Sequence, residues 1–330
     1  MVKDRQPTAR VSRRELLALG ALACAAPITG WAQDFSAKPV RLIVAFAPGG
    51  GVDVSARIIA PRLGDELKTP VIVENKVGAS GMIGSEYVAK AAPDGFTLLY
   101  TGGSAISIVP QLVAKPPINS LTDLVPVNVA GASPLVISLH PSVGIRSLAE
   151  FLAQARTRDL KLASAGIGTL THLTIELLSQ ATGGRIVHVP YKGGGAAVAD
   201  ALAGHVDGMI SDIPPVFQHF QDNRLVPIAL TSEQRMDLLP QVPTVHEALK
   251  GFTASSWNAV FAPKGTSKAI VDKVNAALVK VVSREDVAAQ LKKAGVVPGP
   301  YPSPEAFRAF VASEYERWGK LVKDRNITMS

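Results

Sequence analysis

The sequence from Pro39 to Asp53, PVRLIVAFAPGGGVD, predicts a buried strand, a glycine loop and the start of a helix, in that order. Val40–Phe46 is an apolar run rich in β-branched residues, which is typical of a buried strand. Pro48 and three glycines end this run, and from Val52 to Leu67 the apolar residues recur at helical spacing. Glycines let a ligand approach the main chain, and the first turn of a helix has unpaired N–H groups. The stretch therefore predicts an anion-binding cradle.

Short apolar strands alternate with helical patterns along most of the chain. This alternation indicates an α/β fold with mostly parallel sheets flanked by helices, and the 330-residue chain is long for one such sheet. Strands are expected at 40–46, 71–74, 97–101, 135–139, 160–163, 186–189, 206–210 and 226–230. Helices are expected at 52–67, 81–91, 147–155, 170–180, 196–203, 268–282, 284–293 and 304–323.

Two extended stretches, 128–139 and 253–263, are interpreted as crossover strands between two lobes. A chain that crosses twice gives a discontinuous first lobe, 34–131 with 256–330, and a second lobe, 132–255. Two α/β lobes joined by two strands can close on a ligand by hinge bending. The alternative is one continuous doubly wound domain.

Five glycine-containing loops follow predicted strands, three in the first lobe and two in the second. Ligands of open α/β sheets bind at the carboxyl ends of the strands, so the loops predict a shared cleft lined with N–H groups. A single loop of this kind also has an ordinary steric explanation. Because only Lys76 and Lys192 lie beside these loops, backbone N–H groups and hydroxyls are expected to hold the anion. The candidate ligand-binding residues are Phe46, Ala47, Pro48, Gly49, Gly50, Gly51, Asp53, Ser80, Gly81, Thr101, Ser104, Ser164, Gly166, Gly168, Thr169, His172, Gly193, Gly194 and Asp212.

Several candidates also have a purely structural interpretation. Asp53 either caps the helix that follows it or orients a ligand donor, and Asp212 faces the same choice. His172 is the only histidine placed to touch the cleft, and its alternative is a packing role. Tyr191 and Trp257 line the cleft or pack in the core.

Residues 1–32 are expected to be an export leader. Basic residues precede an uncharged apolar run at Leu16–Ala26, and small residues precede a cleavage point after Ala32. The pair Arg13-Arg14 resembles a twin-arginine signal, with a general secretory signal as the alternative. A membrane anchor and lipidation of Cys24 are further alternatives. The mature protein is then expected to be periplasmic.

The leader also carries much of the charge. It holds five basic and two acidic residues, so its removal lowers the net charge from +7 to +4. This mild charge, without a basic run that includes aromatic residues, argues against a nucleic-acid partner. The only cysteine lies in the leader, which excludes disulfides, thiol catalysis and cysteine metal sites from the mature chain.

No common catalytic or metal-binding motif is complete. The first glycine loop lacks the G-x-G-x-x-G spacing, and no Gly-Lys-Ser/Thr occurs. Ser80 and Ser164 each lack one glycine of the G-x-S-x-G pattern. The six histidines show no H-x-H or i,i+4 pairing with one another. The sequence therefore predicts no catalytic residue, no metal and no cofactor, and a secreted enzyme is the less favoured alternative.

Four segments together resemble the Bug family, the extracytoplasmic solute receptors of tripartite tricarboxylate transporters. They are PVRLIVAFAPGGGVD, VIVENKVGASG, AKAAPDGFTLLYTG and HVPYKGGGAAVADALAGHVDGMISD, and the resemblance continues through FAPKGTSKAIVDKVNAAL. Departures from the family pattern occur at Ser80-Gly81-Met82 and in Thr253–Val260, which lacks the usual Trp-Gly spacing.

This resemblance implies a two-lobed periplasmic binding protein of the second type. Its ligand is expected to be a small carboxylate: a dicarboxylate, an amino acid or an aromatic acid. The loop 46–51 with Asp53 is expected to hold one carboxylate from the first lobe, while 164–169 and 193–195 close from the second. The expected partners are the permease subunits of a tripartite tricarboxylate transporter, and the receptor is expected to be a monomer. A ligand-sensing subunit for a membrane signalling kinase is the alternative function.

Overall fold

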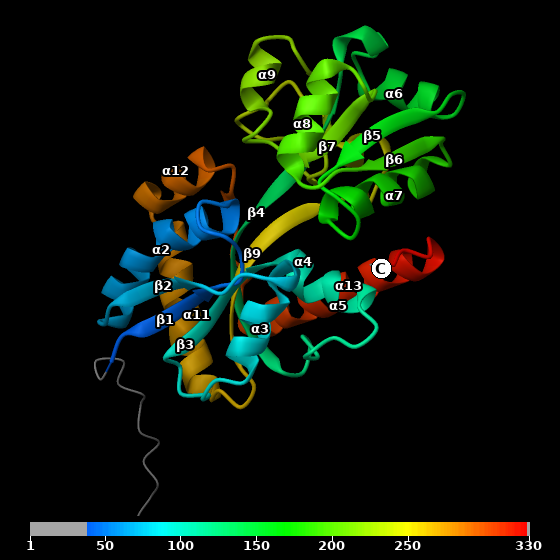
Figure 1. Cartoon of the computed structure of the whole chain (residues 1–330). Coiled ribbons are helices and arrows are strands. Elements are labelled where there is room, and N and C mark those ends of the chain that lie inside the picture. The colour runs from blue at the N-terminus through cyan, green and yellow to red at the C-terminus, as the bar shows by residue number, and fades with distance from the viewer. Residues whose placement is uncertain (1–37, 329–330) are drawn as a thin grey trace, which may run out of the picture. The chain divides into compact units, whose positions relative to one another are not determined.

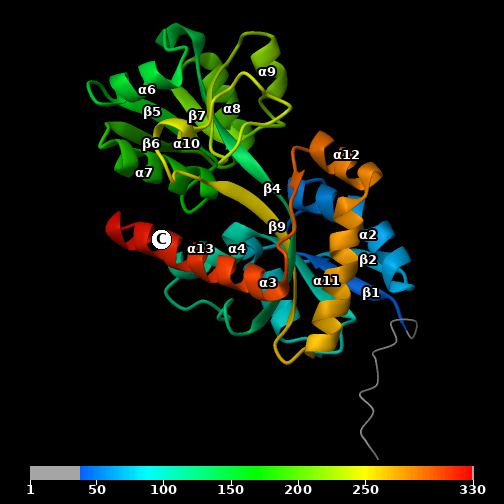
Figure 2. The same cartoon turned by 180° about the vertical axis from the view of Figure 1, so that it is seen from behind.

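The computed structural model describes residues 38–328. The predicted leader 1–32, with Cys24, lies outside the described residues. Within them, the expected alternation of strands and helices is confirmed, and the chain forms a mixed α/β structure (Figures 1 and 2). No helix in the described part is long and apolar enough to cross a membrane.

Sheet A, as named here, has the strand order β2-β1-β3-β9-β4-β10. Its strands β1, β2 and β3 are parallel, whereas β9 runs antiparallel to both β3 and β4. The bounds are β1 Val40–Val44, β2 Val71–Asn75, β3 Thr97–Gly102, β4 Leu124–Leu139, β9 Ser255–Pro263 and β10 Val297–Pro298. Nearly every residue of β1 is buried because the sheet is covered on both faces, as expected for parallel strands.

Sheet B has the strand order β6-β5-β7-β4-β8, so the single long strand β4 belongs to both sheets. The bounds are β5 Leu160–Ser164, β6 Ile186–Pro190, β7 Gly208–Asp212 and β8 Val226–Leu230. The change of sheet occurs in the middle of β4, since Pro134 pairs with Ser255 of β9 and Leu135 pairs with Asp212 of β7. We call this point of β4, between Pro134 and Leu135, the crossing. Figure 1 shows β4 and β9 running side by side there.

The pairing register directs the loops of both sheets toward this crossing. In sheet A, Gly102 at the end of β3 pairs with Asn258, near the start of β9. In sheet B, Asp212 at the end of β7 pairs with Leu135, immediately after the change of sheet. Because β1 and β2 are parallel to β3, and β5 and β6 are parallel to β7, the carboxyl ends of both sets face the crossing. Loops at those ends are therefore in place to share a ligand.

Helices cover both faces of each sheet. On sheet A, α2 and α11 pack on one face, while α3, α4 and α13 pack on the other. On sheet B, α6, α7 and α10 cover one face and α8 lies on the other. The bounds are α2 Gly51–Leu67, α3 Met82–Ala89, α4 Gly103–Ser107, α5 Val109–Leu112, α6 Leu148–Ala155, α7 Leu170–Thr182, α8 Gly194–Ala203, α9 Phe217–Gln221, α10 Val245–Ala248, α11 Lys268–Ser283, α12 Glu285–Lys293 and α13 Pro304–Asp324.

The eight predicted helices are all present, with ends that differ by one to two residues. Strand β4 starts earlier than expected, because the strand predicted at 135–139 and the extended stretch predicted at 128–139 both leave out Leu124–Val127. The first half of β4 contains Pro126 and Gly131, which argue against a strand. The structure accommodates both by register shifts against β9, between Pro126 and Asn128 and between Val129 and Gly131. The predicted strand 206–210 lies two residues later, at Gly208–Asp212.

Candidate functional site

The N-terminal caps place most of the helices in two classes. A Ser or Thr hydroxyl accepts a hydrogen bond from the first turn of several helices, as is usual. Glycine precedes a second group, and these helices have no side-chain cap. The capping residues are Ser147, Thr169, Thr244, Ser267 and Ser303 for α6, α7, α10, α11 and α13. The glycines are Gly50, Gly81, Gly102 and Gly193 for α2, α3, α4 and α8.

Helix α2 begins at the crossing with its first N–H groups free. Gly50 has an extended backbone, with φ −73° and ψ 162°, and gives no side-chain cap. Its carbonyl accepts the first helical hydrogen bond, from Val54 N–H at 2.9 Å. In the described part of the chain, the N–H groups of Gly51, Val52 and Asp53 meet no acceptor. A 17-residue helix thus presents unpaired donors, together with its positive dipole end, toward the crossing.

Helix α8 presents the same feature from sheet B. Gly193, with φ 110°, precedes the helix in a conformation that favours glycine. Its own N–H donates to the Ala165 carbonyl at 3.0 Å, which ties α8 to the neighbouring loop. Among the described residues, the N–H groups of Gly194, Gly195 and Ala196 receive no acceptor. Sheet A and sheet B therefore each contribute an uncapped helix whose first N–H groups are free, α2 and α8.

The free space next to each glycine's Cα distinguishes the glycines that are required for packing from those that leave room for a ligand. In the part of the chain that the structure describes, a Cβ built on Gly49, Gly51 or Gly193 to Gly195 meets nothing within 4 Å, so packing does not require glycine there. A Cβ on Gly81 lies 2.7 Å from the Cβ of Ala105, and one on Gly103 meets the Trp257 ring. Gly81 and Gly103, which follow β2 and β3, are therefore explained by close packing. The open glycines at α2 and α8 leave room for a ligand.

Asp53 organises the loop that precedes α2. Its side chain is buried and accepts hydrogen bonds from Gly49 N–H at 2.9 Å, Arg57 Nε at 2.9 Å and Asn75 Nδ2 at 2.8 Å. Asn75 also donates to the Phe46 carbonyl at 2.9 Å. Both carboxylate oxygens thus have protein partners, and Asp53 shapes the cradle from the third position of the helix. The interpretation that Asp53 caps the helix is wrong, because Gly50 is the N-cap and no side chain caps α2; Asp53 instead holds the loop before the helix.

Burial raises the pKa of Asp53, but the hydrogen bonds from Arg57, Gly49 and Asn75 outweigh it and lower the pKa to about 2. A carboxyl whose pKa is lower in the folded state stabilises the fold above its unfolded pKa, near 3.8, and this stabilisation is lost as the pH falls toward 2. We expect Asp53→Asn to lower the free energy of unfolding by about 2 kcal/mol at pH 7. The difference from wild type should shrink as the pH falls toward 2. Urea unfolding of both proteins at pH 7 and near pH 2 measures this free-energy difference. An equal difference at both pH values would contradict a lowered pKa for Asp53.

The loop between β5 and α7 uses most of its own donors. Ala165 N–H donates to Thr171 Oγ1 at 3.1 Å, and Gly166 N–H donates to Ser164 Oγ at 3.1 Å. Gly168 N–H donates to His172 Nδ1 at 3.1 Å. The Thr169 hydroxyl caps α7 and donates to the Gly166 carbonyl at 2.7 Å. Ser164, Gly166, Gly168, Thr169 and His172 therefore lie together in one internally bonded loop, which leaves few donors for an anion.

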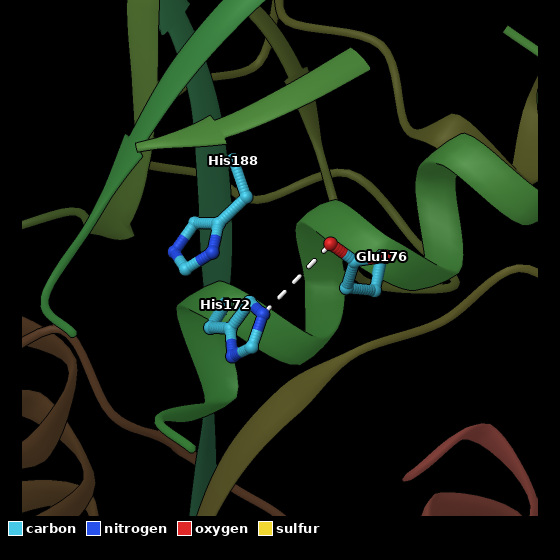
Figure 3. A group of neighbouring side chains, drawn as sticks. All are labelled: His172, Glu176 and His188. Atoms are coloured by element: carbon cyan, nitrogen blue, oxygen red, sulfur yellow. Dashed lines mark ion pairs between the residues drawn. The ribbon is translucent and has the colours of Figure 1, made fainter. Parts of the chain in front are cut away.

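Three titratable side chains meet behind this loop (Figure 3). His172 and Glu176 lie on α7, and His188 lies on β6. The two imidazole rings stack with centroids 3.8 Å apart and an interplanar angle of 17°. A metal ion binds in the plane of each imidazole ligand, and two nearly parallel stacked planes have no common point at bonding distance. The group is close enough to suggest a metal site, but its ring geometry does not converge on one.

The remaining predicted residues are distributed around the two strand ends. Ser80 is exposed, and Ser104 is half-buried in α4. Thr101 is buried, with its hydroxyl unpaired, on the face of sheet A that packs against α13. Asp212 retains solvent contact, yet the surrounding protein raises the pKa of its carboxyl. Asp212 has no hydrogen-bonding side-chain partner among the described residues and stays a predicted ligand contact.

A cavity of about 690 Å³ lies on the α13 side of the crossing. Its walls include Trp257, Tyr301 and Phe310, and none of the predicted ligand-binding residues lines it. Its basic side chains already have acidic partners: Arg235 pairs with Glu247, Lys292 with Asp237, and Arg317 with Glu314. The cavity is therefore less suited to an added anion than the uncapped helix ends.

Sequence reasoning missed several residues of the site. Asn75 and Arg57 hold Asp53, and a polar residue at the end of a predicted strand was the available signal for Asn75. His188 sits at the centre of sheet B's polar cluster but was not singled out. Arg325, near the C-terminus, binds Glu176 at 2.6 Å, and no local pattern points to this pair.

Comparison with known proteins gives a consistent result. A model of the tripartite tricarboxylate transporter family receptor matches residues 55–327. Protein BugT of Bordetella pertussis is 38% identical over 304 residues, which cover 91% of this chain and 92% of BugT.

Solved structures are also similar. MatC from Rhodopseudomonas palustris, with bound malate, has a TM-score of 0.71 and 30% identity, covering 87% of this chain and 100% of MatC. An R. palustris protein with adipate has a TM-score of 0.76 and 30% identity, covering 89% of this chain and 99% of that one. A structure titled as periplasmic binding protein BugD has a TM-score of 0.71 and 31% identity, covering 90% of this chain and 100% of that one. These similarities confirm the predicted two-lobed α/β fold of a periplasmic binding protein.

Proposed function

Because the chain belongs to the family of tripartite tricarboxylate transporter receptors, we propose that it binds a small carboxylate between the N-termini of α2 and α8. Receptors of this family are periplasmic proteins that bind small carboxylates and work with membrane transporters, and they are not enzymes. Delivery to permease subunits of such a transporter is the proposed role of this chain. We further propose that the receptor acts as a monomer after cleavage near Ala32.

The uncapped helix ends are the observation that carries this proposal. Among residues 38–328, the N–H groups of Gly51 to Asp53 and of Gly194 to Ala196 have no acceptor, and both sets lie at strand ends that face the crossing. Six free donors and two helix dipoles favour a ligand with negative charge at each end. Malate and adipate, which bind the two relatives from R. palustris, are both dicarboxylates. A dicarboxylate is therefore the proposed ligand class.

The proposal also assigns the lobes. We take 34–131 with 256–330 as the first lobe and 132–255 as the second. The hinge is proposed at the crossing, where β4 and β9 pass from one lobe to the other. The exchange of partners at Pro134 and Leu135 supports this division, because each half of β4 is bonded to a different sheet. Hinge bending at that point would bring the two helix ends onto the ligand.

Calorimetric titration of the mature protein with succinate, malate, adipate, glutamate and benzoate tests the proposed function. We expect at least one dicarboxylate to bind, and its dimethyl ester to show no binding because the ester carries no negative charge. If no acid binds, the carboxylate proposal is wrong. If an ester binds as tightly as its acid, recognition by main-chain donors is wrong.

A further inference from the structure

We propose that the stacked pair His172 and His188 positions the ligand-binding end of α8, acting through the loop between β5 and α7. This inference rests on the proposed function and assigns neither histidine a direct ligand contact. The pair lies in sheet B's half of the chain, behind that loop (Figure 3).

Each histidine holds one end of the loop. His172 Nδ1 accepts a hydrogen bond from Gly168 N–H at 3.1 Å, where the loop enters α7. His188 Nε2 lies 2.6 Å from Ser164 Oγ, where β5 ends. Because the rings stack 3.8 Å apart, a movement of one ring displaces the other. The loop between these two points contains Gly166 and Gly168, both with positive φ, and would otherwise be free to change conformation.

The loop in turn holds the start of α8. Gly193 N–H donates to the Ala165 carbonyl at 3.0 Å, and Tyr191 N–H donates to the Ser164 carbonyl at 3.2 Å. A Cβ on Gly166 would come within 2.8 Å of the Tyr191 carbonyl, so the two loops are in close contact. The histidines are therefore linked to Gly193, which precedes the free N–H groups of α8, by a chain of two hydrogen bonds.

The protonation state fits this positioning role. His172 can accept from Gly168 N–H only when its Nδ1 is unprotonated, which places the remaining proton on Nε2. That Nε2 lies 3.8 Å from Glu176 Oε1, while the other oxygen of Glu176 is held by Arg325 at 2.6 Å. Burial lowers the pKa of His172 to about 4, and burial with the neighbouring His172 lowers that of His188 to about 4. Both rings are consequently neutral at pH 7.

Matched variants separate positioning from general packing. His172→Leu removes the acceptor, whereas the Oδ1 of His172→Asn can occupy nearly the position of Nδ1. His188→Leu and His188→Gln form the equivalent pair for Ser164. Leu173→Ala serves as the control, because Leu173 is buried on the same helix but packs against the α13 side.

Amide hydrogen exchange of the mature protein, followed by NMR, reads the loop without any ligand. We expect His172→Leu to raise the exchange rate of both Gly168 and Gly193 at least tenfold relative to the global core amides, and His172→Asn to leave both near wild type. Likewise, we expect His188→Leu to raise the exchange rates of Gly166 and Gly193, and His188→Gln to leave both near wild type. Leu173→Ala should change the global rates only. The inference is overturned if the exchange rate of Gly193 stays at the wild-type value in either His172→Leu or His188→Leu. It is also overturned if Leu173→Ala raises the Gly193 rate relative to the core amides.

Titration with malate and adipate provides the second readout. For whichever acid binds wild type, we expect at least a tenfold loss of affinity in His172→Leu and less than a threefold loss in His172→Asn. Equal affinity in wild type and His172→Leu overturns the positioning role. If wild type binds neither these two acids nor any other dicarboxylate of the calorimetric panel, the proposed ligand class is wrong, and the exchange rates still decide whether the histidines position α8.

Discussion

Gly51→Val is expected to reduce carboxylate affinity at least 100-fold while leaving the fold intact. A valine side chain here enters open space, because no atom of the described residues outside the immediate chain neighbours lies within 4 Å of a Cβ built on Gly51. The residue already belongs to α2, so the backbone need not change. The side chain would cover the free N–H groups of the first turn and displace the anion. Loss of two charge-assisted hydrogen bonds costs about 3 kcal/mol, or about 100-fold in affinity.

The same reasoning applies to Gly195→Val at the start of α8. Ala199→Val is the matched control, since Ala199 is exposed on the same helix but lies beyond its first turn. Calorimetric titration measures affinity, and circular dichroism verifies the fold. Lys192→Ala should weaken binding by less than tenfold, because main-chain donors provide most of the affinity. Wild-type affinity in both valine variants would contradict the site, and complete loss in Lys192→Ala would transfer the main role to a side-chain cation.

Trp257→Ala is expected to lower the free energy of unfolding by about 3–5 kcal/mol. The side chain is 3% exposed, and its ring lies 5.8 Å from the rings of both Phe307 and Phe310. It also fills the space above Gly103, so its removal leaves a cavity next to the crossing. Because domains of this kind are stable by only about 5–15 kcal/mol, the loss is a large fraction of the total.

Urea unfolding of wild type, Trp257→Ala and Trp257→Phe measures this effect. Phenylalanine keeps the aromatic contact and should lose clearly less stability than alanine. An alanine variant within 1 kcal/mol of wild type would show that the ring is not part of the core. This result would favour the cleft-lining interpretation that the sequence left open.

The fold could be predicted from sequence largely because most of the long helices and strands have a local pattern, whereas the short helices α4, α5, α9 and α10 were not predicted. Apolar runs and helical spacing located all eight predicted helices within one to two residues. The start of β4, 124–127, was not predicted because Pro126 argues against a strand locally, and Gly131 does so inside the extended stretch that was expected at 128–139. Their cost is met by pairing with β9, whose residues lie more than 120 positions later in the sequence.

The candidate site was harder to predict than the fold. All five glycine loops look alike in sequence, but a glycine's role depends on what lies above its Cα. Gly81 is packed against Ala105 and Gly103 against Trp257, whereas Gly51 and Gly195 face open space. The histidine pair illustrates the same limit, because the contact between α7 and β6 appears in no i,i+4 pattern.

The C-terminal helix α13 has a consequence for how the receptor operates. It starts against sheet A, and its last turns pack on α7, where Trp318 and Leu321 share an apolar cluster with Leu173 and Arg325 pairs with Glu176 (Figure 2). The two halves are therefore connected at this helix as well as through β4 and β9. A rotation of one half against the other that preserves the contact between α13 and α7 has its axis near that contact. The largest displacement then occurs on the side of the molecule farthest from α13. Removing the final turns of α13 would thus change the range of the hinge rotation rather than the main-chain donors that hold the ligand.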